Sequence, residues 1–75
     1  MQDLKNIVES LLFVAEEPLG PERLRKILEP AEAGAIAEAI AALRVEYEAR
    51  QGGFYLAEVA GGYQFRTRPE HTSWI

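Results

Sequence analysis

The chain has 75 residues, of which 48% are hydrophobic and 27% are charged, and its net charge is −4. This length allows one small domain and excludes a cofactor cleft between two domains, and the composition is typical of a globular protein rather than a disordered one. The lack of cysteine excludes a disulfide framework and a thiolate metal site. The acidic balance argues against sequence-independent binding to nucleic acid, which requires a basic face.

The N-terminal segment has neither the basic region nor the cleavage site of a secretory signal. The longest apolar run, residues 11–15, is far shorter than the roughly 20 residues that span a bilayer. We therefore expect a soluble, intracellular protein that does not enter a membrane.

Three amphipathic helices are predicted over residues 4–15, 21–28 and 33–50, because apolar residues recur there at helical spacing. Phe13 and Val14 lie off the apolar stripe of the first helix, which indicates a second contact surface. Leu19, in the connection that follows, can pair briefly with a strand.

A β-hairpin is predicted next, because aromatic and aliphatic residues fill 54–60 and 63–68 on either side of Gly61-Gly62. A two-residue turn at these glycines is our preferred interpretation, whereas a three-residue turn would change which residues share a face. The preferred register places five side chains on one face: Phe54, Leu56, Tyr63, Phe65 and Thr67.

The residues after Pro69 are typical of the first turn of a fourth helix, and the apolar Trp74 and Ile75 come last. We therefore expect the chain to be the N-terminal part of a longer, two-domain protein.

This order of elements predicts a mainly α fold with a β-hairpin, the winged helix-turn-helix, as a single domain over residues 1–75. It comprises three helices, the hairpin as the wing, and the start of a fourth helix. The expected core consists of Leu4, Ile7, Val8, Leu11, Leu12, Leu24, Ile27, Leu28, Ile36, Ile40, Leu43, Leu56 and Phe65.

A winged helix suggests a DNA-binding transcription regulator as one alternative. The third helix would enter the major groove, yet its charge balance is negative and residues 31–50 contain no asparagine, glutamine or lysine to read a base edge. Arg66 and Arg68 on the wing are the candidate DNA contacts under this alternative. The other explanation for them is a charged strand edge exposed to solvent.

No catalytic arrangement is visible. The two serines, Ser10 and Ser73, and the single histidine, His71, do not form a nucleophile–base pair, and the paired glycines lack the lysine of a phosphate loop. We expect a protein that is not an enzyme and that has no catalytic, cofactor-binding or metal site.

The sequence has more apolar residues than a core of this size needs. The additional residues either extend the core or form a surface for a partner. For these residues taken as a group, we favour a partner surface, because contiguous apolar patches and aromatic residues mark interfaces. The candidate interface residues are Phe13, Val14, Phe54, Tyr55, Tyr63 and Trp74.

Two stretches resemble a known family. Residues 7–19 read IVESLLFVAEEPL and residues 58–70 read EVAGGYQFRTRPE. The first resembles the opening of the segregation and condensation protein B (ScpB) family, and the second, which is more distinctive, resembles that family's wing. The resemblance covers nearly the whole chain.

The resemblance implies a non-enzymatic subunit with two winged-helix domains in tandem, of which this chain matches the first. ScpB proteins form homodimers largely through that domain. With the kleisin subunit ScpA they bind the SMC ATPase, in a condensin-like complex that condenses and segregates bacterial chromosomes during the cell cycle. It therefore implies a cytoplasmic, nucleoid-associated protein that dimerises and contributes to the contact with ScpA.

Overall fold

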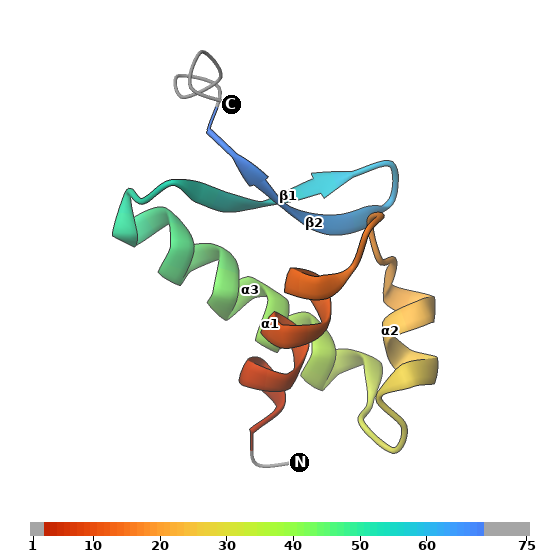
Figure 1. Ribbon diagram of the computed structural model, residues 1–75. Helices are drawn as coiled ribbons and strands as arrows, with labels where there is room; N and C mark the ends of the chain where they lie inside the picture. The colour runs from red at the N-terminus through yellow and green to blue at the C-terminus, as the bar shows by residue number, and fades with distance from the viewer. Residues whose placement is uncertain (1–2, 69–75) are drawn as a thin grey trace.

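The computed structural model describes residues 3–68, which form three helices followed by a two-stranded antiparallel hairpin (Figure 1). The elements are α1 (Leu4–Val14), α2 (Pro21–Ile27), α3 (Ala33–Arg50), β1 (Phe54–Val59) and β2 (Gly62–Thr67). Each helix lies where the apolar periodicity predicts it, with α1 and α2 one residue shorter at their C-terminal ends. The predicted fourth helix lies outside the described residues.

The connections explain where the helices begin and end. Pro21 begins α2, at the position where its missing N–H costs nothing. Gln51 ends α3 by adopting the left-handed conformation, with φ of 52°, and its side-chain amide donates to the carbonyl of Glu48 at 2.7 Å.

The hairpin turn lies one residue earlier than predicted. Val59 pairs with Gly62, so the turn consists of Ala60 and Gly61, and both have positive φ. The prediction of Gly61-Gly62 as the turn is therefore wrong. The shift moves the pairing by two positions, which leaves the five predicted side chains on a common face, with Leu56 opposite Phe65.

A single residue of the α1–α2 connection pairs with the hairpin as an isolated β-bridge. Leu19 forms a bridge with Tyr63, in which each backbone N–H donates to the other residue's carbonyl at 3.0 and 2.9 Å. This confirms the predicted pairing of Leu19, and it ties the α1–α2 connection to the outer edge of β2.

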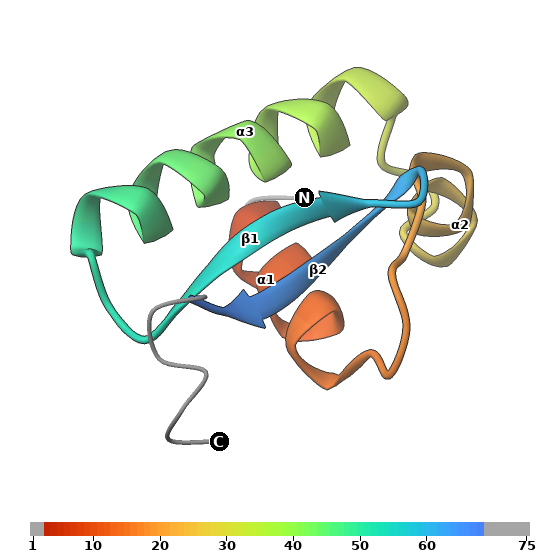
Figure 2. The same ribbon diagram turned by 90° about the horizontal axis from the view of Figure 1, so that it is seen from above.

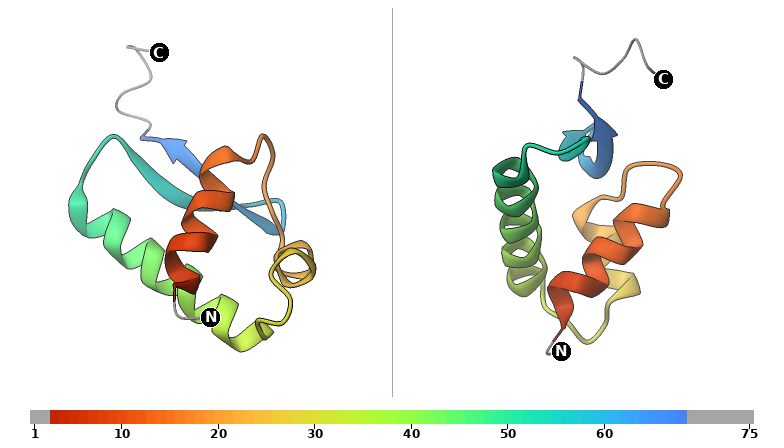
Figure 3. Two further views of the ribbon diagram at one scale, coloured as in Figure 1. Left: turned by 60° about the horizontal axis from the view of Figure 1, so that its bottom comes forward. Right: turned by 60° about the vertical axis from the view of Figure 1, so that its left-hand side comes forward.

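The helices and the hairpin enclose one core. Figure 3 shows α3 along one side, α1 and α2 along the other, and the hairpin across the end between them. The buried residues of the core are Val8, Leu12, Leu24, Leu28, Ile36, Ala39, Ile40, Leu43, Tyr47 and Leu56, with Leu4, Leu11 and Phe65 partly buried against them.

Two residues assigned to the core are exposed. Ile7 is 37% and Ile27 is 48% exposed, so their assignment is wrong. Ile7 lies one position before the fully buried Val8, on a side of α1 that no other element covers completely. Ile27 is the last residue of a helix only seven residues long, which buries Leu24 alone. The arrangement is nevertheless the predicted winged helix-turn-helix, with α2 and α3 as its two helices and the hairpin as its wing.

Candidate protein-interaction surface

An aromatic cluster joins three elements of the fold. The ring of Tyr47 on α3 lies 4.8 Å from that of Phe65 on β2 and 6.0 Å from that of Phe54 on β1, measured between centroids. The rings of Phe54 and Phe65 meet edge to face at 6.0 Å. Such tilted and offset contacts are favourable, and they hold the open end of the hairpin on the C-terminal half of α3.

Phe13 and Val14 lie beside this cluster on the surface. Leu12 is buried in the core, and the next two residues of α1 turn away from it because each helical residue rotates by about 100°. Phe13 is therefore 66% and Val14 73% exposed. Phe13 borders two shallow hollows, one of about 150 Å³ shared with Phe54 and Phe65 and one of about 370 Å³ shared with Val14 and Tyr47.

We call these residues the aromatic surface: Phe13, Val14, Tyr47, Phe54 and Phe65. It contains three of the six predicted interface residues, Phe13, Val14 and Phe54, which the fold brings together from α1 and β1. Phe65 belongs to the expected core and Tyr47 is buried on α3, and the sequence carries no local signal that these two residues also line the hollows.

Polar contacts fix α1 against α3 at this surface. The hydroxyl of Tyr47 donates a hydrogen bond to the carboxylate of Glu9, and Lys5 forms an ion pair with Glu46. The hydrogen bond to Glu9 raises the pKa of Tyr47, with a further contribution from burial. The tyrosine therefore keeps its proton, and can donate it to Glu9, throughout the physiological pH range.

The other predicted interface residues lie elsewhere. Tyr63 is half-buried against the core and pairs with Leu19. Tyr55 occupies the opposite face of the hairpin, where the guanidinium of Arg68 lies 5.7 Å from its ring centroid. Trp74 lies outside the described residues, and its role stays a prediction.

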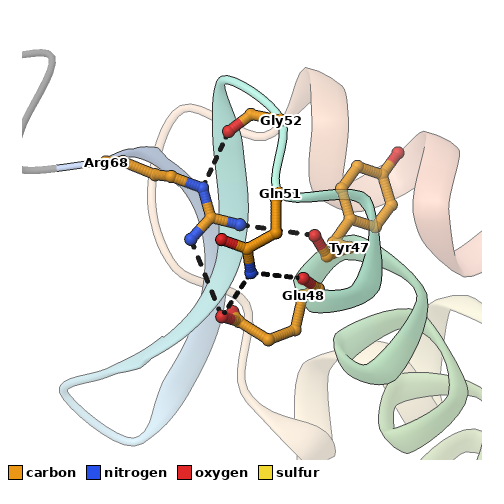
Figure 4. Close-up of polar contacts among 5 residues, drawn as sticks. All are labelled: Tyr47, Glu48, Gln51, Gly52 and Arg68. Atoms are coloured by element: carbon orange, nitrogen blue, oxygen red, sulfur yellow. Dashed lines mark hydrogen bonds and ion pairs between the residues drawn. The ribbon is translucent and has the colours of Figure 1, made fainter.

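The two wing arginines differ in what they contact. Arg68 crosses from the end of β2 to the end of α3 (Figure 4). Its Nε donates to the Gly52 carbonyl at 2.7 Å and its guanidinium lies 3.7 Å from the carboxylate of Glu48. The Arg68 side chain is only 12% exposed, so its charge is used within the domain, whereas Arg66 is exposed and bonds to Gln64 at 3.2 Å.

Residues 3–68 contain no group of three or more histidine, cysteine, aspartate or glutamate side chains placed to hold a metal ion. His71 lies outside the described residues. Within the same part of the chain, every helix is too short or too polar to cross a membrane.

A further exposed apolar residue, Val45, is not singled out by the sequence analysis. Val45 is 70% exposed on α3, beside a groove between that helix and β1. It lies off the buried stripe of α3, in the same way that Phe13 and Val14 lie off that of α1, so the same pattern could have identified it.

Comparison with known proteins places this fold in a family. The model of the family described as segregation and condensation complex subunit ScpB matches residues 6–75. The chain belongs to the ScpB family. The match begins in the first turn of α1 and includes the rest of that helix, α2, α3 and the hairpin, and it confirms the resemblance drawn from residues 7–19 and 58–70.

A relative and two solved structures illustrate the match. Segregation and condensation protein B of Syntrophotalea carbinolica is 44% identical over 73 residues, which are 97% of this chain and 36% of that protein. The chain thus spans about a third of the length of the curated relative it matches. The crystal structure of ScpB from Mycobacterium tuberculosis has a TM-score of 0.86 at 23% identity, over 97% of this chain and 45% of that one, which shows the shared fold.

The third comparison is with a single domain. The crystal structure of a dimer of the ScpB N-terminal domain complexed with ScpA peptide has a TM-score of 0.83 at 27% identity. The match covers 97% of this chain and 90% of that chain. The match thus includes nearly all of that solved N-terminal domain.

Proposed function

We propose that this chain is the N-terminal domain of a ScpB protein and a non-enzymatic, dimerising subunit of an SMC–kleisin complex. In this role it contributes to binding the kleisin ScpA and, through ScpA, the SMC ATPase. The complex acts in chromosome condensation and segregation, in the cytoplasm and at the nucleoid.

The exposed aromatic surface is the observation that carries this proposal. Phe13 and Val14 are both more than half exposed next to a ring cluster, on a chain whose net charge of −4 would otherwise keep copies apart. Burying such residues is favourable by about 1.5–3 kcal/mol for each large side chain that is fully covered. The similar ScpB N-terminal domain, described as a dimer with ScpA peptide, supports a second copy as the occupant.

The shape of the surface fits contact between identical copies. Phe13 is 66% exposed and borders both hollows, and a two-fold contact requires one patch to provide both the inserted and the receiving part. Phe13 of each copy would enter a hollow of the other copy. We expect the twofold axis to pass near α1 and the open end of the hairpin.

The alternative of a DNA-binding regulator has less support. Among the described residues, the charge of Arg68 is bound to the end of α3, and α3 itself carries three acidic residues, Glu38, Glu46 and Glu48, against two arginines. Of the two candidate DNA contacts on the wing, this leaves Arg66 exposed, and a single wing arginine does not supply multiple phosphate contacts.

Sedimentation equilibrium of the chain across the micromolar range tests the proposal. We expect a reversible monomer–dimer equilibrium, and we expect the full-length protein to bind its cognate ScpA. A strict monomer at high micromolar concentration, together with no binding of ScpA by the full-length protein, would contradict it.

A further inference from the structure

The two hollows that Phe13 borders are otherwise lined by different elements. One, of about 150 Å³, is lined by residues of the two strands, and we call it the strand hollow. The other, of about 370 Å³, is lined by residues of α1 and α3, and we call it the helix hollow. Figure 2 shows β2 on the side of the hairpin that lies over α1, with β1 toward α3. The two hollows therefore lie on different sides of Phe13.

The linings of the two hollows contain side chains of opposite charge. Arg66 lines the strand hollow and Glu9 lines the helix hollow. Glu9 accepts a hydrogen bond from Tyr47 and Arg66 donates one to Gln64, but within residues 3–68 neither forms an ion pair. The nearby Arg50 lies over the ring of Tyr47 instead. Arg66 is exposed and Glu9 partly exposed, so both charges are accessible to a partner.

A two-fold contact between copies can be arranged in two ways around Phe13. Residues on opposite sides of the axis meet each other, and residues on the axis meet their own copies. An axis that runs through both hollows would place Arg66 against Arg66 and Glu9 against Glu9. An axis that crosses between the hollows, at Phe13, places Arg66 of each copy against Glu9 of the other. Like charges across an interface are disfavoured and opposite charges fix its register, so the second arrangement is favoured.

We propose that the dimer contact at the aromatic surface contains two symmetry-related ion pairs, each between Arg66 of one copy and Glu9 of the other. This inference rests on the proposed function and deepens it, because it assigns the relative orientation of the two copies and the residues that specify it. The apolar residues around Phe13 then lie at the centre of the contact and the charges at its rim, which is the usual arrangement of protein interfaces. The hydrogen bond of Arg66 to Gln64 joins two exposed side chains, which rearrange at little cost.

The same pattern favours a second copy over a ScpA peptide as the occupant of this surface. A partner that covered both hollows would need an acidic group at the strand hollow, a basic group at the helix hollow and an apolar group between them. This chain itself presents that combination, since Glu9 and Arg66 flank Phe13. A second copy therefore matches both charges at once, and such complementarity determines specificity and orientation more than affinity.

Charge reversal in two separate variants tests the pairing. Arg66→Glu and Glu9→Lys each replace both ion pairs of a homodimer by like-charge contacts, so sedimentation equilibrium should give dimer dissociation constants at least about tenfold above wild type. An equimolar mixture of the two variants should form heterodimers within about threefold of the wild-type constant, because each heterodimer contains one native and one reversed ion pair. Arg23→Glu makes the same charge change at an exposed position of α2 and should leave the constant unchanged.

A further variant separates the charge of Glu9 from its role in folding. Glu9→Lys also loses the hydrogen bond from Tyr47, whereas the amide oxygen of Glu9→Gln can still accept it. Glu9→Gln should therefore remain folded, as circular dichroism can verify, and should weaken the dimer about threefold or more, the effect of losing two exposed ion pairs.

The other outcomes overturn the pairing. These are equal dimerisation of Arg66→Glu and wild type, an equal loss in Arg23→Glu, unaltered dimerisation of Glu9→Gln, or a mixture that dimerises no better than its two components. Failure of the proposed function is distinct, because the wild-type chain would then stay monomeric, whereas a wild-type dimer that is insensitive to these changes would overturn the pairing alone.

Discussion

At the scale of single residues, the hairpin turn places an alanine in a conformation that suits glycine or asparagine. Ala60 has φ of 50° and Gly61 has φ of 78°, which are the two left-handed positions of a type I′ turn. A side chain other than glycine, asparagine or aspartate is disfavoured there, because its Cβ crowds the backbone.

Replacing this alanine should therefore stabilise the domain. Asn-Gly is the preferred sequence for such a turn, so we expect Ala60→Asn to raise the free energy of unfolding by about 0.5–1 kcal/mol. Urea denaturation measures the change. Equal or lower stability of the variant would show that Ala60 is not in the left-handed conformation.

The neighbouring glycine is required for a different reason, which is lack of space. A Cβ on Gly62 would lie 2.9 Å from the carbonyl carbon of Leu19 and 3.0 Å from Cβ of Pro18. This contact explains why the turn was placed one residue too late from the sequence, since a pair of glycines indicates a turn but does not show that one of them packs against a distant segment.

Gly62→Ala should be destabilising by about 1–3 kcal/mol, because the backbone of the α1–α2 connection must shift to admit a methyl group. Gly53→Ala is the matched control, since no atom lies within 4 Å of a Cβ there, and its effect should stay within about 0.5 kcal/mol. Thermal or urea unfolding measures the stability of both variants and tests this difference. Similar stabilities would refute the close approach of Leu19 to β2.

At the scale of elements, Arg68 fastens the end of the hairpin to the end of α3. Its guanidinium donates to the carbonyls of Gly52 and Tyr47, at 2.7 and 3.4 Å. The last carbonyls of a helix have no partner within the helix, and a cation near them also interacts favourably with the helix dipole. Arg68 therefore acts as a structural residue, which a sequence reading of two alternating arginines does not reveal.

Arg68→Gln should lower the free energy of unfolding by about 1.5–3 kcal/mol, the range for hydrogen bonds made by charged groups. Arg66→Gln removes an exposed arginine whose one bond is to Gln64, and should cost less than about 0.5 kcal/mol. Chemical denaturation measures the free energy of unfolding of both variants and tests the difference between them. Equal costs would mean that Arg68 does not hold the two elements together.

The sequence predicted the elements better than it predicted their exposed faces. The periodicity of α3 identified its bounds and three residues of its buried stripe, Ile36, Ile40 and Leu43, because one regular pattern specifies both. α1 has more apolar residues than one face can hold, so the pattern alone could not decide that Val8 is buried and Ile7 exposed. That choice depends on where α3 and the hairpin pack.

At the scale of the whole molecule, the predicted interface separates into different surfaces. Phe13, Val14 and Phe54 meet at the aromatic surface, Tyr55 lines the groove beside α3, and Tyr63 packs on the core. A surplus of aromatic residues in a sequence shows that some of them remain exposed, but tertiary packing assigns each one to its surface.

The central claim is that the domain dimerises through the aromatic surface, and Val14→Glu tests it most directly. Val14 and Val45 are similarly exposed, at 73% and 70%, so Val45→Glu introduces the same charge outside that surface. We expect sedimentation equilibrium to give a dimer dissociation constant for Val14→Glu at least about tenfold above wild type, about 1.4 kcal/mol, and an unchanged constant for Val45→Glu. Unaltered dimerisation of a folded Val14→Glu variant would contradict the account.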